Sequence, residues 1–368
     1  MAIVDEANHR PALVGPGVEL LTYKTPQGAA KTTHPYLQGY EAAIRRGQQI
    51  ARACLALKQR GFVPDIVCAH AGWGEALFIK EIFPQAILLD YFEFYYRTRG
   101  ADVGFDPEIH ASSLDDDCRI STRNACHLQS IESADWGWSP TAWQASRFPE
   151  HFRAKLSVIH EGIDTKIVKP DADAVFQTPA GLKLTRIEQV VTFVNRNLEP
   201  YRGFHIFMRA LPRILRDHPH AQVVIVGGDR VSYGSPPREG GTWRECMLAE
   251  VGSELDMQRV HFVGKLPYPA YLQLLQVSSA HVYLTYPFVL SWSMLEAMAA
   301  GCALIASDTP PVTEVVRHTH DALLVDFFDI EALAEQVGRV LNKPQEYQAM
   351  REQARKTIHE RYDLESVC

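Results

Sequence analysis

The residues best suited to chemistry lie in the stretch 286–314, where a serine pair precedes an acid and a glycine. Ser291 and Ser293 are residue types that cap helix N-termini. The run 294–300 consists of strong helix formers and ends at Gly301, a typical helix stop. The stretch is therefore expected to form a loop, a helix, a short apolar strand, a proline-rich turn and the start of another helix.

The predicted helix start is a candidate anion site with an acid beside it. Unpaired backbone N–H groups and the positive end of the helix dipole point outward at this end, where Ser291, Trp292 and Ser293 stand. Glu296 is expected in about the first turn, and one carboxylate can accept hydrogen bonds from two vicinal hydroxyls. The alternative is that Glu296 interacts with the helix dipole alone.

Basic residues and glycines follow other predicted strands in the second half of the chain. Arg196 and Arg202 come after a strand expected over 190–194. Five further candidates follow the next two strands: Gly227, Gly228, Gly264, Lys265 and Leu266. Because parallel strands end at a common edge, these residues are expected to line one edge and to suit a diphosphate. The alternatives are that both arginines are ordinary surface residues and that the Gly227–Gly228 pair is only a turn.

Two titratable residues follow strands in the first half of the chain. His70 ends a strand expected over 66–69 and either faces a substrate or has a structural role. Glu93 follows the next strand and either orients a hydroxyl or forms a buried ion pair with Arg97. The aromatic run 91–96 around Glu93 is either a sugar-stacking platform or, as favoured here, part of the core.

Length and composition limit the class of protein. The 368 residues are enough for two domains with separate cores, and 46% hydrophobic with 22% charged residues is typical of a soluble globular chain. A net charge of −7 argues against nonspecific binding of nucleic acid. Seven scattered cysteines without CxxC spacing indicate a reducing cytoplasm and neither a zinc site nor a disulfide framework. No apolar run is long enough to span a membrane, and no signal peptide is recognisable.

Strands alternate with helices along the whole chain. Strands are expected over 18–23, 66–69, 86–89, 135–139, 155–159, 190–194, 221–226, 260–263, 281–284, 303–306 and 322–325. Helices are expected over 39–60, 75–82, 117–132, 204–217, 243–252, 268–278, 294–300 and from 330 onward. Such alternation favours α/β architecture, with parallel sheets covered by helices on both faces. Residues 1–165 and 166–368 are predicted to form two domains, with a linker over 165–187 and a last helix that packs back on the first domain.

The stretch 286–314 resembles the donor-sugar motif of retaining GT-B glycosyltransferases of the family 4 type. That motif has Glu, seven residues, Glu, and then Ala-Met-Ala-x-Gly. Glu296 and the residues 297–301 match it, whereas Phe288 stands in place of the first acid. The segment 195–203, NRNLEPYRG, is similar to the family's Gly-Arg-x4-Lys-Gly with one extra residue, and 160–164 is similar to its hinge sequence.

The resemblance implies a GT-B fold, in which two doubly wound Rossmann-like domains face each other across a cleft. It implies transfer, with retention, from a nucleoside-diphosphate sugar to a carbohydrate or lipid-linked acceptor, as in cell-surface polysaccharide assembly. UDP is the favoured nucleotide and GDP the second. Arg196 and Arg202 would neutralise the departing diphosphate, Glu296 would bind ribose hydroxyls, and the backbone at 264–266 would hold the base. His70 and Glu93 would face the acceptor, and neither a metal nor another cofactor is expected.

Phe288 keeps further interpretations open, because a phenyl ring cannot accept hydrogen bonds from sugar hydroxyls. It indicates a different donor sugar, compensation by an acid such as Glu93, or lost activity. Specialisation is favoured, since the residues around Phe288 look specific. The alternatives are a degenerate nucleotide-sugar-binding protein and a GT-B-fold epimerase. A dinucleotide-dependent dehydrogenase is disfavoured, because no G-x-G-x-x-G follows any strand.

The two ends and one helix carry further expectations. Relatives of this type usually have a first strand, a Gly-rich turn and a first helix before Val18, so the chain is expected to be shortened there and to end within a helical tail. The exposed side of helix 39–60 is rich in Lys and Arg. It is either a solvated face or a contact with anionic lipid, which would place a cytoplasmic protein at the inner face of the membrane.

Overall fold

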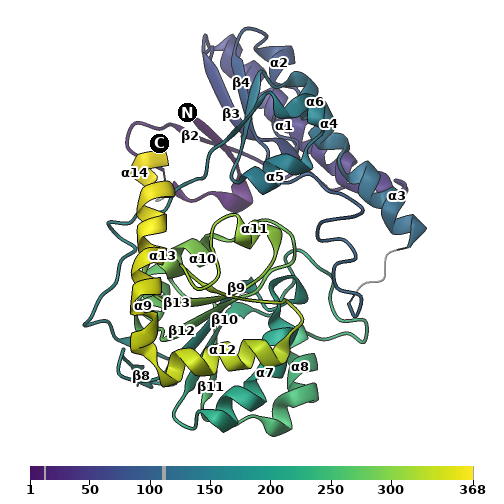
Figure 1. The fold of residues 1–368 in the computed structure, drawn as a ribbon. Coiled ribbons are helices and arrows are strands. Elements are labelled where there is room, and N and C mark those ends of the chain that lie inside the picture. The colour runs from purple at the N-terminus through teal and green to yellow at the C-terminus, as the bar shows by residue number, and fades with distance from the viewer. Residues whose placement is uncertain (12–13, 110–112, 368) are drawn as a thin grey trace. The chain divides into compact units, whose positions relative to one another are not determined.

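The computed structural model describes residues 1–11, 14–109 and 113–367. The chain divides into two compact units, Met1–Ile159 and His160–Cys368. Strands and helices alternate in both, and all strands of the two larger sheets are parallel, as predicted from the sequence (Figure 1).

The second unit is built on a six-stranded sheet with the order β11-β10-β9-β12-β13-β14. Its strands are β9 (Val190–Asn197), β10 (Gln222–Gly228), β11 (Val260–Gly264), β12 (Ala280–Tyr283), β13 (Ala303–Ser307) and β14 (Leu323–Val325). In order along the chain this is 3-2-1-4-5-6, the doubly wound order of Rossmann folds. The order reverses between β9 and β12, and ligands of such sheets bind where the strands on either side of the reversal end.

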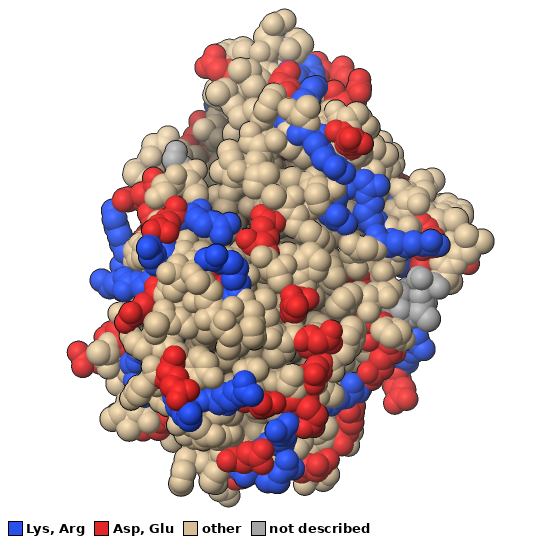
Figure 2. All heavy atoms as spheres, viewed as in Figure 1, with Lys and Arg blue, Asp and Glu red and all other residues tan. Residues whose placement is uncertain are grey.

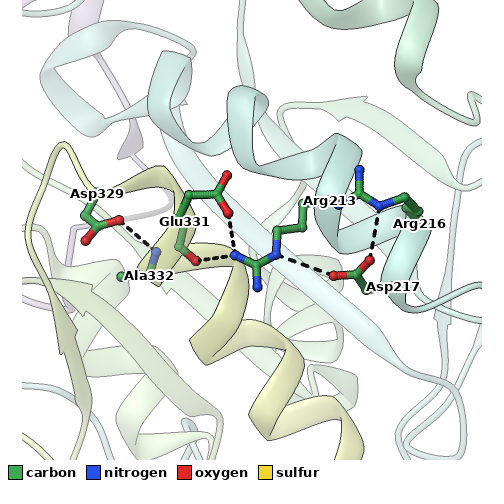
Figure 3. A network of polar contacts seen from close by, with 6 residues as sticks. All are labelled: Arg213, Arg216, Asp217, Asp329, Glu331 and Ala332. Atoms are coloured by element: carbon green, nitrogen blue, oxygen red, sulfur yellow. Dashed lines mark hydrogen bonds and ion pairs between the residues drawn. The ribbon is translucent and has the colours of Figure 1, made fainter.

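Helices cover both faces of this sheet (Figure 1). The helices of this unit are α7 (Phe204–Asp217), α8 (Trp243–Val251), α9 (Tyr268–Val277), α10 (Trp292–Ala299), α11 (Pro310–Thr313), α12 (Ile330–Asn342), α13 (Gln348–Arg361) and, after α13, the short α14 (Leu364–Val367). α7 and α12 pack together, and Arg213 of α7 joins them by pairing with Glu331 of α12 and with Asp217 (Figure 3). α10 packs on α13, and both contribute to an apolar cluster with β12 and β13.

The segment expected to be a linker is partly structured. It contains the antiparallel pair β7 (Phe176–Gln177) and β8 (Lys183–Leu184). The side chains of Phe176 and Leu184 are buried in one core cluster with residues of β9 and β10. Strands of two residues carry no periodic signal, which is why the sequence reads as a polar connection here.

The first unit contains a four-stranded parallel sheet with the order β3-β4-β5-β6. These strands are β3 (Ile66–His70), β4 (Ile87–Tyr91), β5 (Trp136–Ser139) and β6 (Leu156–Val158). A separate parallel pair joins β1 (Ala2–Asp5) to β2 (Leu20–Tyr23). β1 was not predicted, because its four residues precede charged residues and turn formers.

The helices of the first unit depart most from expectation. They are α1 (Gln38–Gln59), α2 (Ile79–Ile82), α3 (Leu114–Arg123), α4 (Ala125–Ser133), α5 (Ala142–Arg147) and α6 (Glu150–Arg153). α2 is shorter than predicted. The single helix expected over 117–132 is two helices that meet at Asn124, whose side chain binds the backbone of Tyr96 and so has a tertiary role. α3 begins earlier because Ser113 and Asp116 form a capping box.

One face of the first sheet is more open than predicted. Along β4, Leu88 and Asp90 are buried, whereas Ile87 is exposed. Ile66 of β3 and Trp136 of β5 are exposed as well. The strand expected over 66–69 is present, but the expectation that it is buried is wrong, because the residues of β3 are exposed or half-buried.

Candidate functional site

Arg202 lies at the reversal point of the second sheet. It belongs to a short 3-10 turn (Pro200–Arg202) after β9, followed by Gly203 with φ of 67°. The glycine is required because a Cβ there would come within 2.3 Å of Leu284 and because the backbone is left-handed. Arg202 is only 5% exposed, so the alternative of an ordinary surface residue is wrong for it.

The guanidinium of Arg202 organises the loop that follows β12. Its Nη1 donates to the Tyr283 hydroxyl at 3.2 Å, to Thr285 Oγ1 at 2.7 Å and to the Val289 carbonyl at 2.9 Å. Among the described residues its Nε and Nη2 make no hydrogen bond and are not enclosed. A cation fixed by neutral acceptors keeps its charge and its remaining donors for an anionic ligand.

Aromatic rings surround this cation. The guanidinium carbon lies 5.2 Å from the ring centre of Tyr233 and 6.0 Å from that of Phe288. Phe288 is buried, and its ring lies 5.0 Å from Tyr233 and 5.4 Å from Tyr201. Tyr286 packs on Tyr201 at 4.7 Å, so these four rings form one aromatic cluster. Phe288 thus has a well-packed place in the site.

Glu199 holds the loop that supplies Tyr233. It is fully buried, and its carboxylate accepts backbone N–H bonds from Ser232 at 2.9 Å, Tyr233 at 3.1 Å and Gly234 at 2.9 Å. Three N–H donors compensate for the cost of burying the charge. Sequence reasoning missed Glu199, although it shares a segment with both arginines.

Glu296 is already engaged by two tyrosines. It is the fifth residue of α10, directly after the first turn, close to where the sequence analysis expects it. Its Oε1 accepts from the Tyr268 hydroxyl at 2.7 Å, and its Oε2 accepts from the Tyr271 hydroxyl at 2.7 Å. Burial raises the pKa of Glu296, and these hydrogen bonds act in the opposite direction. The tyrosines were also missed, although their spacing of three residues on α9 places them on one helix face.

The N-terminus of α10 forms as predicted. Ser291 is its N-cap, with Oγ accepting from the Ser293 backbone N–H at 3.3 Å, and the two hydroxyls lie 2.9 Å apart. Trp292 is exposed, and its indole N–H donates to Glu161 at 3.3 Å. The backbone donors of this helix start thus lie beside the loop that Arg202 organises.

The strands are longer than expected, so Arg196, Gly227, Gly228 and Gly264 are the last or nearly last residues of β9, β10 and β11, and only Lys265 and Leu266 follow a strand. Arg196 is exposed and forms no hydrogen bond or ion pair with the described residues, so the surface alternative stands for it. Gly228 is close to Lys265, since a Cβ there would lie 2.8 Å from Lys265 Cε. Gly227 packs against Leu198, which a Cβ would approach to 2.7 Å, so this glycine also serves packing. Two positions at and after the end of β11 differ from each other: Gly264 has φ of 66° in open space, and Leu266 packs on the core.

Two polar atoms at the end of β9 lack partners. The Asn195 Nδ2 and Asn197 Oδ1 atoms are buried and form no hydrogen bond with the described residues. Buried polar groups of this kind are normally satisfied by water or a ligand. Both atoms lie at the strand end that leads to Arg202.

His70 and Glu93 come together in the first unit. The His70 Nδ1 accepts the Gly72 backbone N–H at 3.1 Å, and the Nε2 lies 3.3 Å from Glu93 Oε2. In a neutral imidazole that accepts at Nδ1, the proton is on Nε2, so His70 donates to Glu93. The ion pair of Glu93 with Arg97 is not formed. Arg97 instead donates to the Arg147 carbonyl at 2.9 Å.

Both residues line a cavity of about 480 Å³ within the first unit. Its wall includes Tyr96, from the predicted aromatic run, and four residues that sequence reasoning did not single out: Trp73, Arg119, Arg123 and His127. In the run 91–96, Phe92, Phe94 and Tyr95 are buried, which confirms the core interpretation, and Phe94 and Tyr96 also line the cavity.

The distribution of charged side chains and the hydropathy of the helices bear on the expected membrane contact. On the face shown in Figure 2, both signs are mixed over the second unit, whereas basic side chains gather over the region of α3 to α6. On α1, Arg45 pairs with Glu41, while Arg46 and Lys58 donate to backbone carbonyls, so part of its basic side is already engaged. Among the described residues, no helix combines the length and the apolar character that crossing a bilayer requires.

Comparisons with known proteins decide the family. The model described as "Glycosyl transferase family 4 group" matches residues 1–168, and "Glycosyl transferases group 1" matches residues 182–357. The chain belongs to the GT-B glycosyltransferases of this family. This glycosyltransferase is 25% identical over 356 residues to glycogen synthase of Mycobacterium tuberculosis, covering 92% of this chain and 77% of that one. It is 27% identical over 192 residues to D-inositol 3-phosphate glycosyltransferase of Acidothermus cellulolyticus, covering 51% and 41%.

Solved structures show the same fold. Sucrose-phosphate synthase from Thermosynechococcus elongatus has a TM-score of 0.67 at 20% identity, over 94% of this glycosyltransferase and 80% of that chain. HepE from Anabaena, in complex with UDP-glucose, has a TM-score of 0.61 at 16% identity, over 87% and 80%. The GT-B fold expected from the sequence is thereby confirmed.

Proposed function

We propose that this glycosyltransferase moves a sugar, with retention, from a nucleoside-diphosphate sugar, with UDP favoured and GDP second. The observation that carries the proposal is Arg202. Its guanidinium is buried, is held by three neutral acceptors at the end of β12 and in the loop after it, and lies at the reversal point of a doubly wound sheet. The complexes of HepE with UDP and UDP-glucose support UDP as the nucleotide.

In this proposal the protein mainly positions the substrates and neutralises the charge of the leaving diphosphate. As the bond from the sugar to the diphosphate breaks, negative charge grows on the leaving oxygen, and Arg202 stabilises it because the cation is already in place. Arg196 and Lys265 are exposed cations near the same strand ends and add to this charge. The acceptor hydroxyl attacks from the face that the diphosphate leaves, and a phosphate oxygen takes its proton. The scheme uses fixed cations and requires neither a metal nor another cofactor.

Glu296 is proposed to bind the ribose diol. Each carboxylate oxygen has two acceptor positions, and one tyrosine hydroxyl occupies one of them on each oxygen. Tyr268 and Tyr271 therefore orient the carboxylate and still leave it able to accept from a diol. Backbone groups at 264–266 would hold the base, since Gly264 leaves open space there.

Phe288 is proposed to set the donor sugar. Its ring is packed against Tyr201 and Tyr233, beside the cation that faces the diphosphate. An apolar wall of this kind favours a sugar with fewer polar groups on that side. The second candidate function is a nucleotide-sugar-binding protein without turnover. It is favoured by the presence of Phe288 where the family motif has an acid.

The acceptor is proposed to be a carbohydrate or a lipid-linked sugar, as in polysaccharide assembly, bound near His70 and Glu93. Contact with the inner face of a membrane would use the basic residues of α1 that remain exposed, such as Arg52. The proposed acceptor and the proposed membrane contact do not depend on the donor site.

Thermal shift against a panel of nucleotides and nucleotide sugars tests the donor site. UDP or one UDP-sugar is expected to raise the melting temperature of the full chain, and Glu296→Gln to lose most of this shift. The exposed substitution Glu239→Gln is the matched control. Absence of a shift with any UDP, GDP or ADP compound in a folded sample would contradict the proposal.

A further inference from the structure

The cavity of the first unit carries an arginine without an acidic partner. The guanidinium carbon of Arg123 lies 3.7 Å from the ring centre of Tyr96, and its Nη2 donates to the Tyr96 hydroxyl at 2.8 Å. Among the described residues, Arg123 forms no ion pair with a carboxylate. Stacking on a ring fixes the plane of the guanidinium and leaves N–H donors at its edge for an anion.

A second arginine lines the same cavity one helical turn away. Arg119 stands four residues before Arg123 on α3, so both are on one helix face. Arg119 is paired with Asp116 at 2.9 Å and is half exposed, so part of its charge is compensated. The arginine end of the cavity thus retains a net positive charge, and most of it comes from Arg123.

His127 lies in the wall of the same cavity. It is 6% exposed and lines the cavity, and its Nδ1 is buried without a hydrogen-bond partner among the described residues. Burial lowers the pKa of His127 to about 3, and the nearby His70 and Arg123 act in the same direction. The imidazole is therefore neutral at physiological pH and offers a hydrogen bond that no described protein group satisfies.

The remaining charged lining is suited to hydroxyl groups. The Glu93 carboxylate accepts from His70 at 3.3 Å and stays partly exposed, so it can also accept from a diol. Trp73 stacks on His70 with ring centres 4.5 Å apart and is half exposed. Because Glu93 repels a phosphate and Arg123 attracts one, a ligand that has both a phosphate and hydroxyls would bind in one orientation.

We infer that this cavity binds a polyhydroxylated ring that carries a phosphate group, with the phosphate on Arg123 and ring hydroxyls on Glu93. The inference rests on the proposed function in one respect, namely that this ligand is the acceptor of the transfer. The phosphate can belong to a soluble sugar or cyclitol phosphate or to a lipid headgroup, and the two sources share the same chemistry at Arg123. The volume of about 480 Å³ suits one such ring with its phosphate.

Isothermal titration of the full chain tests this inference directly. The probes are glucose 6-phosphate, inositol 1-phosphate, their unphosphorylated counterparts, inorganic phosphate, and vesicles with or without phosphatidylinositol. A phosphorylated ring or the phosphatidylinositol vesicle is expected to bind at least ~10-fold more tightly than the neutral ring, because a charge-assisted bond is gained. Which of the two binds identifies the source of the phosphate.

Variants connect the affinity to the residues. Arg123→Gln is expected to weaken binding of the phosphorylated ring about 10- to 100-fold, whereas the control Arg216→Gln, at an exposed position in the second unit, leaves it within about 2-fold. Tyr96→Leu keeps the charge but removes the stacking platform, and an intermediate loss of about 3- to 10-fold is expected. Glu93→Gln is expected to weaken binding of the neutral ring as much as that of the phosphorylated one.

Three results would overturn the inference: equal binding of neutral and phosphorylated rings, binding of inorganic phosphate as tight as that of the ring phosphate, or no effect of Arg123→Gln. Thermal shift with UDP in the same samples separates this test from that of the proposed function. If UDP fails to bind but the phosphorylated ring binds through Arg123, the proposed donor site fails and the cavity assignment stands.

Discussion

The guanidinium carbon of Arg202 lies 6.0 Å from the ring centre of Phe288, and Arg202 also binds the carbonyl of Val289, the next residue. The residue that replaces the expected acid and the cation that would face the diphosphate therefore belong to one loop arrangement. Their effects on activity should be coupled.

Arg202→Lys should lower kcat/KM for the donor by about 10- to 100-fold. A lysine keeps the charge but cannot bind Tyr283, Thr285 and Val289 from one nitrogen while directing further donors at a ligand. Steady-state kinetics measures the loss. Arg216→Lys, on the exposed end of α7, is the control, and an equal loss in both variants would contradict the role of Arg202.

Phe288→Glu should lower turnover with the wild-type donor by about 10-fold or more. The new carboxylate would pair with the nearby Arg202 and compensate the charge offered to the diphosphate. Phe288→Leu keeps the site apolar and should stay within about 3-fold. Higher activity of Phe288→Glu on the same donor would show instead that the phenyl ring is an impairment.

Glu199→Gln should destabilise the protein by about 2 kcal/mol, because a charged acceptor of three backbone N–H bonds becomes a neutral amide. Urea denaturation measures the free energy of unfolding, and hydrogen exchange should become faster at 232–234. Glu239→Gln, exposed in the same loop, is the control. Unchanged exchange at 232–234 would show that Glu199 does not hold this loop in place.

Asp90→Asn should change how stability depends on pH. Asp90 is fully buried on β4 with both carboxyl oxygens unpaired among the described residues, and burial raises its pKa to about 7. The folded state thus holds this proton more tightly than the unfolded state. The resulting stability is fully present below about pH 4 and is lost as the pH rises towards 7.

The difference between Asp90→Asn and wild type should therefore be smallest near pH 4 and reach about 2–4 kcal/mol in favour of the variant at pH 8. Urea denaturation across this pH range measures it. Asp65→Asn, at an exposed position, should show no such trend. A pH-independent difference for Asp90→Asn would show that Asp90 is ionised in the folded protein.

Elements and residues with a strong local sequence pattern could be predicted from the sequence, and those without one could not. α7 was predicted at its observed bounds, since its apolar residues repeat with helical period and a glycine precedes it. Arg202 and Glu296 were found because they belong to a motif and follow strands. The break at Asn124 was missed because the bonds that hold it there run to Tyr96, which no local pattern encodes.

Residues that only tertiary packing brings together could not be predicted from the sequence either. Whether Tyr268 and Tyr271 reach Glu296 depends on how α9 lies against α10, and the sequence does not specify this. Glu199 is a single acid in an irregular segment, so periodicity says nothing about its burial. Arg123 and His127 come from α3 and α4, and their position at one cavity depends on the break between these helices.

The most direct measurement of the central claim is phosphorus NMR of nucleotide-sugar consumption by the full chain, with a panel of UDP- and GDP-sugars and with sugar phosphates as acceptors. At least one donor should be converted to its nucleoside diphosphate, and Glu296→Gln should slow this conversion at least ~10-fold through weaker donor binding. Binding of UDP to the wild-type protein without consumption of any donor would contradict the claim and identify a nucleotide-sugar-binding protein.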